Sequence, residues 1–167
     1  RARLFELRGD LKAARLANEQ ALGLRQKSAV AAWVDVSELD LARIDLLEGE
    51  LTRAEVTCRR LAQRMEDPRD AAAAELLLAQ VLIARDRRSE AARLLENSTL
   101  RRLDGYPDAA LVLESELMLA LAFGADRERL AMMRETAERG DFQLLALRAS
   151  LAESASAALP PTLVDAL

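Results

Sequence analysis

The sequence contains no histidine, one cysteine and few aromatic side chains, and each shortage excludes a class of function. Without histidine, the chain lacks both the commonest general base near neutral pH and the commonest metal ligand. Nucleophilic sites of the serine–histidine–aspartate and cysteine–histidine kinds are therefore excluded within these 167 residues. Cys58 has no second cysteine to pair with, which favours a reducing compartment, and we expect a cytoplasmic protein.

Glycine and long apolar runs are also scarce. The six glycines lie far apart, so neither GxxxxGK[ST] nor GxGxxG occurs, and we expect no cofactor. No stretch reaches the roughly 18 consecutive apolar residues of a membrane span, so we expect no membrane partner. The 24 basic and 28 acidic residues are interspersed, which argues against a nucleic-acid partner because such a partner needs a concentrated basic face.

What the chain has in abundance is alanine and leucine. Hydrophobic residues make up 51% of the sequence although aromatics reach only 3%. Alanine and leucine lose little side-chain entropy in a helix, whereas strands prefer β-branched and aromatic residues. The composition therefore predicts an all-α fold. Because the chain begins inside an apparent helix without an initiator methionine, we also expect it to be a fragment of a longer protein.

A short phrase recurs along the chain with a period near forty residues. It reads RGDLKAARLAN from Arg8 and EGELTRAEVTC from Glu48. The inferred turns start at Gly9, Gly49 and Asp86, and each is followed five residues later by an alanine, namely Ala14, Ala54 and Ala91. A fainter fourth copy places Leu130 at the alanine position. Such a period is typical of stacked helical hairpins, in which each pair covers the apolar face of the next.

The pattern predicts a single domain over residues 1–167, built from helical hairpins. The expected hairpins cover residues 1–27, 28–66, 68–103 and 107–139, and a terminal helix covers 141–158. Within the third hairpin, the first helix is expected over 68–85 and the second over 89–103. Asp67 is the expected N-cap of the former, with Pro68 at its first position and Asp70 in its first turn. Gly140 and Asp141 are expected to cap the terminal helix.

These turns resemble the inter-helix turn of tetratricopeptide repeats. Gly-Asp-Leu-Lys-Ala-Ala-Arg and Gly-Glu-Leu-Thr-Arg-Ala-Glu carry the likeness, and Ala42 and Ala79 match the small residue of that family's first helix. The family's aromatic of the first helix is replaced by Asp45 and Leu82, and the period exceeds the family's usual length. The likeness is nearest to the longer, degenerate repeats of maltose-type bacterial transcription activators and other bacterial regulators. It implies a right-handed superhelical array of about 3.5 to 4.5 antiparallel hairpins.

The resemblance also implies a concave binding face lined by the first helix of each hairpin. Mapped onto this chain, that face comprises Asp40, Arg43, Leu47, Leu77, Gln80, Ala84, Glu116, Leu119 and Phe123. Family members that clamp a carboxylate use lysine and asparagine, whereas the corresponding positions here include Val36 and Ala73. We therefore expect a groove for an amphipathic helix or an apolar peptide rather than for a carboxylate.

The leading hypothesis is a non-catalytic scaffold that binds a peptide or helix of a partner protein. An alternative is a sensing or self-association arm of a larger bacterial transcriptional regulator or signalling kinase. A small helical enzyme is a remote alternative, because only scattered carboxylates favour it. The apolar terminal helices also suggest a homodimer as a partner arrangement.

Several single residues have a structural and a functional interpretation. Cys58 lies on an apolar helical stripe, which favours core packing over a reactive thiol. Trp33 is expected to pack between the first and second hairpins. Phe142 is expected either in the core or at an exposed end.

The charged residues also have a structural and a functional interpretation. The acids of the helix around Asp40, from Asp35 to Glu48, are interpreted as a solvated or partner-facing surface rather than as a metal site. Three arginine pairs are interpreted as plain solvated exterior. They are Arg59 with Arg60, Arg87 with Arg88, and Arg101 with Arg102.

Overall fold

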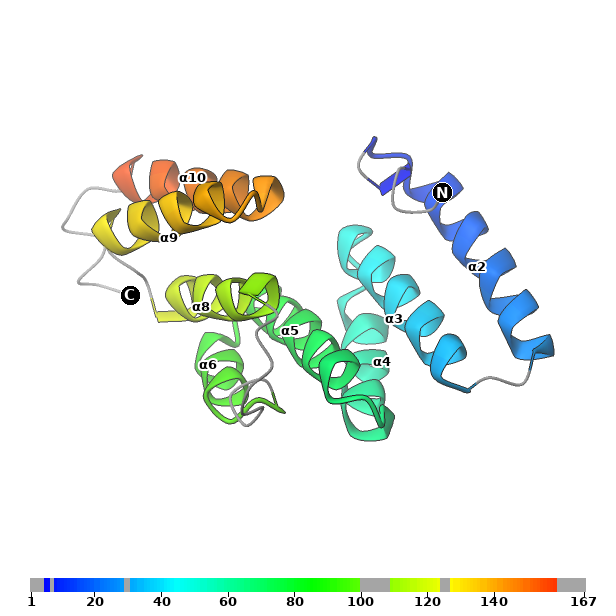
Figure 1. Ribbon diagram of the computed structural model, residues 1–167. Coiled ribbons are helices and arrows are strands. Elements are labelled where there is room, and N and C mark those ends of the chain that lie inside the picture. The colour runs from blue at the N-terminus through cyan, green and yellow to red at the C-terminus, as the bar shows by residue number, and fades with distance from the viewer. Residues whose placement is uncertain (1–4, 7, 29–30, 100–108, 124–126, 159–167) are drawn as a thin grey trace. The chain divides into compact units, whose positions relative to one another are not determined.

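The computed structural model of the chain consists of helices joined by short turns in the residues that it describes, which are 5–6, 8–28, 31–99, 109–123 and 127–158 (Figure 1). No strand occurs in these ranges, so the predicted all-α class is confirmed. The break predicted around residues 104–107 and the faint fourth turn at 125–126 lie outside them.

Backbone contacts divide the chain into two compact units, Arg1–Asp86 and Arg87–Leu167. The first unit contains α2 (Leu11–Lys27), α3 (Ala31–Leu47), α4 (Leu51–Arg64) and α5 (Pro68–Ala84). The second contains α6 (Arg88–Glu96), α8 (Ala109–Phe123), α9 (Arg127–Arg139) and α10 (Gln143–Ala158). The boundary between the units falls at the turn inside the predicted third hairpin.

Within each unit, helices that follow one another along the chain pack together. In the first unit, α2 packs against α3, α3 against α4, and α4 against α5 (Figure 1). α3 also contacts α5, which is the contact between first helices that stacked hairpins produce. In the second unit, α9 and α10 form a closely packed pair, and α8 contacts α6, α9 and α10. This packing is compatible with a helical repeat.

The two glycine turns of the recurring phrase have a left-handed backbone. Gly9 has φ of +75° and Gly49 has φ of +83°. At Gly49, the N–H of Glu50 donates to the carbonyl of Asp45 at 2.8 Å, and the N–H of Gly49 donates to that of Leu46 at 3.1 Å. These two bonds define the Schellman motif, which satisfies the last carbonyls of a helix. Gly49 therefore ends α3 and allows α4 to begin.

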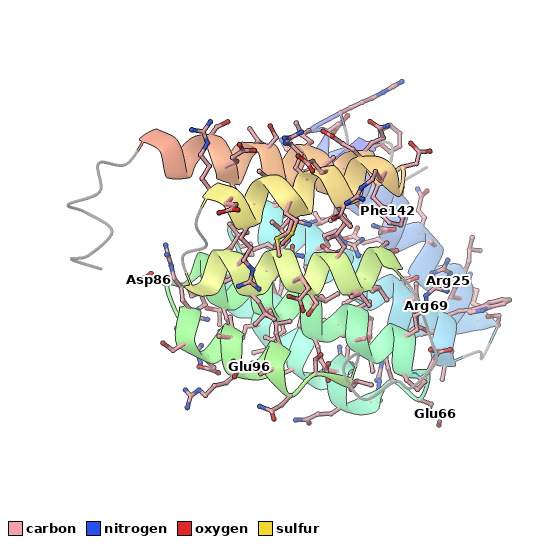
Figure 2. All side chains as sticks on the ribbon, turned by 60° about the vertical axis from the view of Figure 1, so that its left-hand side comes forward. Arg25, Glu66, Arg69, Asp86, Glu96 and Phe142 are labelled. Carbon is pink, nitrogen blue, oxygen red and sulfur yellow. The ribbon has the colours of Figure 1, made fainter. Side chains whose placement is uncertain are left out.

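The turn between α9 and α10 uses its glycine differently from the prediction. Asp141 is the residue with positive φ, at 59°, whereas a Cβ on Gly140 would lie 2.6 Å from Cε2 of Phe142. The glycine is therefore required because the Phe142 ring covers it, and α10 begins only at Gln143. Phe142 itself is half-buried and packs against the cluster of Ala137, Leu145 and Ala146, while Figure 2 shows its place on the ribbon.

Two helix starts are capped by aspartate, and the one at Asp67 was predicted. Asp67 caps α5, since its Oδ1 accepts a hydrogen bond from the N–H of Arg69 at 2.8 Å, and Pro68 and Asp70 occupy the first turn. Asp10 caps α2 by accepting from the N–H of Ala13 at 3.0 Å. Short polar side chains at these positions satisfy N–H groups that have no partner within the helix.

The small residues of the repeat lie in the core. Ala14, Ala54 and Ala91 are all completely buried, and Leu130 of the faint copy is 2% exposed. Cys58 is also completely buried, which confirms its core assignment. Close approach of helices at these positions leaves no room for longer side chains.

One predicted helix is too long. The second helix of the third hairpin, expected over 89–103, ends at Glu96. Nδ2 of Asn97 donates to the carbonyl of Arg93 at 2.8 Å. An asparagine side chain that binds a carbonyl of the last turn competes with helix continuation, which explains the early end.

Candidate binding surface

The positions predicted to form the concave face are distributed over both units. Asp40, Arg43 and Leu47 lie on α3; Leu77, Gln80 and Ala84 lie on α5; and Glu116, Leu119 and Phe123 lie on α8. Leu47 and Ala84 are exposed, whereas Leu77 and Leu119 are buried, with 3% and 5% of their surface accessible. The side chain of Phe123 lies outside the described residues. Substitution tests of this face therefore belong at the exposed positions.

The charged members of this face form ion pairs. Nη1 of Arg43 donates to Oδ1 of Asp40 at 2.8 Å within α3. On α8, Oε2 of Glu116 lies 3.4 Å from Nη2 of Arg129. Both pairs are partly exposed, so they contribute little to stability and are accessible to a partner. Their role in binding stays a prediction.

The other acids of α3 are not a free surface, because they bind arginines of the neighbouring helices. Arg15 of α2 reaches Asp45 at 2.5 Å and Glu48 at 2.6 Å. Arg53 of α4 reaches the same oxygen, Oδ1 of Asp45, at 2.7 Å. Asp45 is only 4% exposed. The interpretation of these acids as solvated or partner-facing is therefore wrong for Asp45, whereas Glu48 is exposed although it is paired with Arg15.

The same pattern continues toward the start of α3. Arg60 of α4 pairs with Glu38 at 3.0 Å, and Arg64 pairs with Glu38 at 2.9 Å and with Asp35. Asp35 is 7% exposed. A carboxylate this deeply buried is tolerated only when a cation and hydrogen bonds compensate it. These side chains therefore hold helices together. Arg59 and Arg60 are exposed, as expected, but both form ion pairs.

An equivalent contact joins α4 to α5. Glu55 of α4 is 4% exposed and accepts from Nη1 of Arg85 at 2.6 Å, and it also pairs with Arg59 in its own helix. Hydrogen bonding to Glu48, and then to Asp45, raises the pKa of Arg15, so this guanidinium stays charged. Arginine–carboxylate pairs thus connect every consecutive pair of helices from α2 to α5.

At one end of these four helices the surface is hollowed. A pocket of about 500 Å³ opens between the end of α2, the first turns of α3 and α5, and the end of α4. Ala31, Ala32, Val34 and Met65 form its apolar wall. We call this hollow the α2–α5 pocket. Its volume lies within the range of about 300 to 1,000 Å³ that is usual for binding sites.

Acidic side chains surround this pocket. Glu66, Asp67 and Asp70 line it together with the ion pair of Asp35 and Arg64. Figure 2 shows Glu66 and Arg69 at this end of the first unit, opposite Asp86. Burial, and secondarily the charge of Asp67, raises the pKa of Asp70. The carboxylates therefore crowd one another at the edge of an apolar hollow.

Next to the pocket, two large apolar side chains face solvent. Trp33 is 56% exposed and Leu24 is 69% exposed, and both line a second hollow of about 350 Å³ with Arg25 and Ser28. The expectation that Trp33 packs between hairpins is therefore wrong. Arg25 connects α2 to α3 here, since its Nη1 donates to Oγ of Ser37 at 2.7 Å. Sequence reasoning missed this end of the unit as a candidate surface.

The described residues also bear on metal sites and membrane spans. No group of three or more cysteine, aspartate or glutamate side chains is arranged to hold a metal ion in those ranges. No helix among the same residues combines the length and apolar character needed to cross a membrane. Comparison of the chain with protein-family models, curated proteins and solved structures returns no match.

Proposed function

We propose that this chain is a non-catalytic scaffold of stacked helical hairpins that binds a peptide or helix of a partner protein. The proposal includes the finer architecture implied by the resemblance to tetratricopeptide repeats, a right-handed array of about 3.5 to 4.5 hairpins. In such arrays the helices serve to position side chains on an extended surface. The recurring turns and the packing of α3 on both α4 and α5 support this architecture.

The observation that carries the function is the α2–α5 pocket with its exposed neighbours. Partner surfaces typically combine a concave apolar centre, an exposed aromatic residue and a polar edge. The α2–α5 pocket supplies the first and third features, and Trp33 supplies the second. By contrast, the buried acids Asp35, Asp45 and Glu55 are bound to arginines, which favours a structural rather than a catalytic use of these carboxylates.

The proposal is tested by selecting displayed random peptides for binding to the whole chain and by mapping their binding with two filling substitutions. Ala32→Phe places a ring in the α2–α5 pocket, and Ala84→Phe places one on the predicted concave face. Both alanines are exposed, so neither change disturbs the core. We expect Ala32→Phe to abolish binding and Ala84→Phe to leave it unchanged.

Each result has a clear consequence. Loss of binding only in Ala84→Phe would show that peptides bind the concave face that the resemblance predicts. The scaffold proposal would then stand, with a different binding site. If no peptide is enriched whose binding responds to either substitution, the chain is not a peptide-binding scaffold. Circular dichroism of both variants verifies that their helical content matches that of the unaltered chain.

A second candidate function is self-association, which would suit an arm of a larger bacterial regulator or kinase. Leu144, Leu147 and Leu151 of α10 are 45%, 56% and 62% exposed. Their spacing of three and four residues puts them on one helical face. Sedimentation velocity over a range of concentrations tests this candidate. Dimers that disappear in Leu147→Gln would support it, and a monomer at every concentration would contradict it.

A further inference from the structure

We propose that the α2–α5 pocket takes a segment of a partner protein in which an apolar side chain is followed closely by lysine or arginine. This inference rests on the proposed scaffold function and names the chemistry of its partner. The pocket has an apolar wall, formed by Ala31, Ala32, Val34 and Met65, which offers no hydrogen-bonding side chain. Only an apolar side chain fills such a wall without leaving a polar group unsatisfied.

Negative charge is in excess around this wall. Four carboxylates line the pocket, but only one guanidinium does, that of Arg64. Arg64 is already bound to Asp35 and Glu38, so its charge is compensated within the protein. The charges that remain, on Glu66, Asp67 and Asp70, are all negative.

The three remaining carboxylates differ in whether they are available to bind a cation of a partner. Asp67 is held by its hydrogen bond to the N–H of Arg69 at the start of α5. Among the residues that the structure describes, Glu66 and Asp70 form no ion pair. Burial and Asp67 both disfavour the charged form of Asp70, and the opposing effect of Arg69 is smaller. A partner's cation would relieve this crowding.

An anionic partner is disfavoured at the same place. The start of α5 would ordinarily attract an anion, because N–H groups of a first turn have no helical partner. Here the carboxylate of Asp67 already occupies that role. A phosphate or an acidic segment would therefore meet three carboxylates, whereas lysine or arginine meets complementary charge.

The experiment uses three dye-labelled peptides of one length and fluorescence anisotropy with the whole chain. The first peptide carries a leucine flanked by two lysines, the second the same leucine flanked by two glutamates, and the third the two lysines flanking a serine. We expect the first peptide to bind about tenfold more tightly than either of the others at low salt. Equal binding of the glutamate peptide, or of the serine peptide, would overturn the inference.

A pair of double variants locates the effect. Glu66→Gln with Asp70→Asn removes two charges from the pocket, and Glu19→Gln with Glu50→Gln removes two exposed charges from elsewhere in the first unit. The first double variant should weaken binding of the lysine peptide about three- to tenfold, since exposed charges at an edge each contribute modestly. The second should change it less than twofold. Equal losses would show attraction to the whole acidic chain and would overturn the inference.

The two proposals fail in different ways. Suppose that Ala32→Phe blocks peptide binding, but that neither the carboxylates of the pocket nor the lysines of the peptide affect the affinity. The scaffold function then stands, and the proposed partner chemistry is wrong. If no peptide binds and Ala32→Phe has no effect, both proposals fall. If Ala32→Phe instead dissociates a dimer in sedimentation, a second copy of the chain is the occupant and the inference is overturned.

Discussion

At the scale of single residues, Asp45 shows how this sequence replaces an apolar core contact by charge. It stands where the resembled family has an aromatic residue, it is 4% exposed, and it accepts from Arg15 and Arg53. Buried pairs of this kind contribute little net stability relative to apolar packing. They are costly to break, however, because the remaining charge loses its partner.

Asp45→Asn is therefore expected to lower the free energy of unfolding by about 1 to 3 kcal/mol. The loss stays below that of a fully buried pair, because Arg15 retains Glu48 and Arg53 reaches solvent. The matched control is Asp40→Asn on the same helix, whose exposed pair with Arg43 should cost no more than about 0.5 kcal/mol. Urea denaturation measures both, and equal losses would contradict the structural role of Asp45.

Cys58 provides a second prediction, on pH dependence. Burial raises the pKa of its thiol to about 12. The unfolded thiol ionises first as pH rises above about 9, while the native thiol keeps its proton, so stability falls with rising pH in this window. The fall should approach, at most, about 1.4 kcal/mol per pH unit.

The measurement compares the unaltered chain with Cys58→Ala between pH 8 and the alkaline limit. The difference between their unfolding free energies isolates the thiol from the other titrating groups. A constant difference would contradict the burial argument. Independently, alkylation of Cys58 at pH 8 should be slow in the native chain and fast in denaturant, because the thiolate is the reactive form.

Trp33 shows why residue-level predictions were sometimes wrong. The run AVAAWV, from Ala29 to Val34, contains only apolar residues. The helical period therefore does not indicate on which face of the helix Trp33 lies. Only the large apolar side chain of Trp33 favoured its burial. The side chain is in fact 56% exposed. Which face of an apolar turn is covered depends on the neighbouring helix, and this information is not local.

At the scale of helices and turns, two glycines should respond to alanine with opposite signs. Gly49 has φ of +83° and Gly23 lies within α2, and at both positions an added Cβ would meet no atom within 4 Å. Only backbone conformation therefore distinguishes them. Gly49→Ala should destabilise by about 1 to 2 kcal/mol through left-handed strain, whereas Gly23→Ala should stabilise by about 0.5 to 1 kcal/mol.

Thermal and urea denaturation of both variants measure this difference. Because neither substitution adds a side-chain contact, the comparison tests the turn itself. Destabilisation of equal size in both variants would contradict the assignment of Gly49 as the residue that ends α3.

The ion pairs of the α3–α4 hairpin were readable from the sequence in principle. Asp45 and Arg53 each lie four residues from Gly49, and Glu38 and Arg60 each lie eleven residues from it. Residues equally distant from a tight turn face each other in an antiparallel hairpin. The signal was missed because the acids were examined within one helix rather than across the turn.

At the scale of the whole molecule, the division into two units leads to a prediction about folding. All the ion pairs described above lie within one unit or the other. A fragment comprising residues 1–86 should therefore keep its helical circular dichroism and unfold cooperatively, as parts of repeat arrays do. Asp45→Asn should destabilise this fragment by about the same amount as it destabilises the full chain. A fragment without helical signal would show that the first unit depends on the second.

The sequence by itself determined the helical class, the turns at Gly9 and Gly49, the cap at Asp67, and the small residues of the core. These features depend on backbone conformation, capping and helical period, all of which act over a few residues. The same local reasoning could not assign partners to charges. It also could not show which apolar side chains lack a covering helix.

Only the tertiary structure decided those points. It paired the acids of α3 with arginines, exposed Trp33, and formed the α2–α5 pocket from residues between Gln26 and Asp70. The physical reason is that burial and charge compensation depend on which helix faces which. That relation is established by packing between segments far apart in the sequence, so no local pattern contains it.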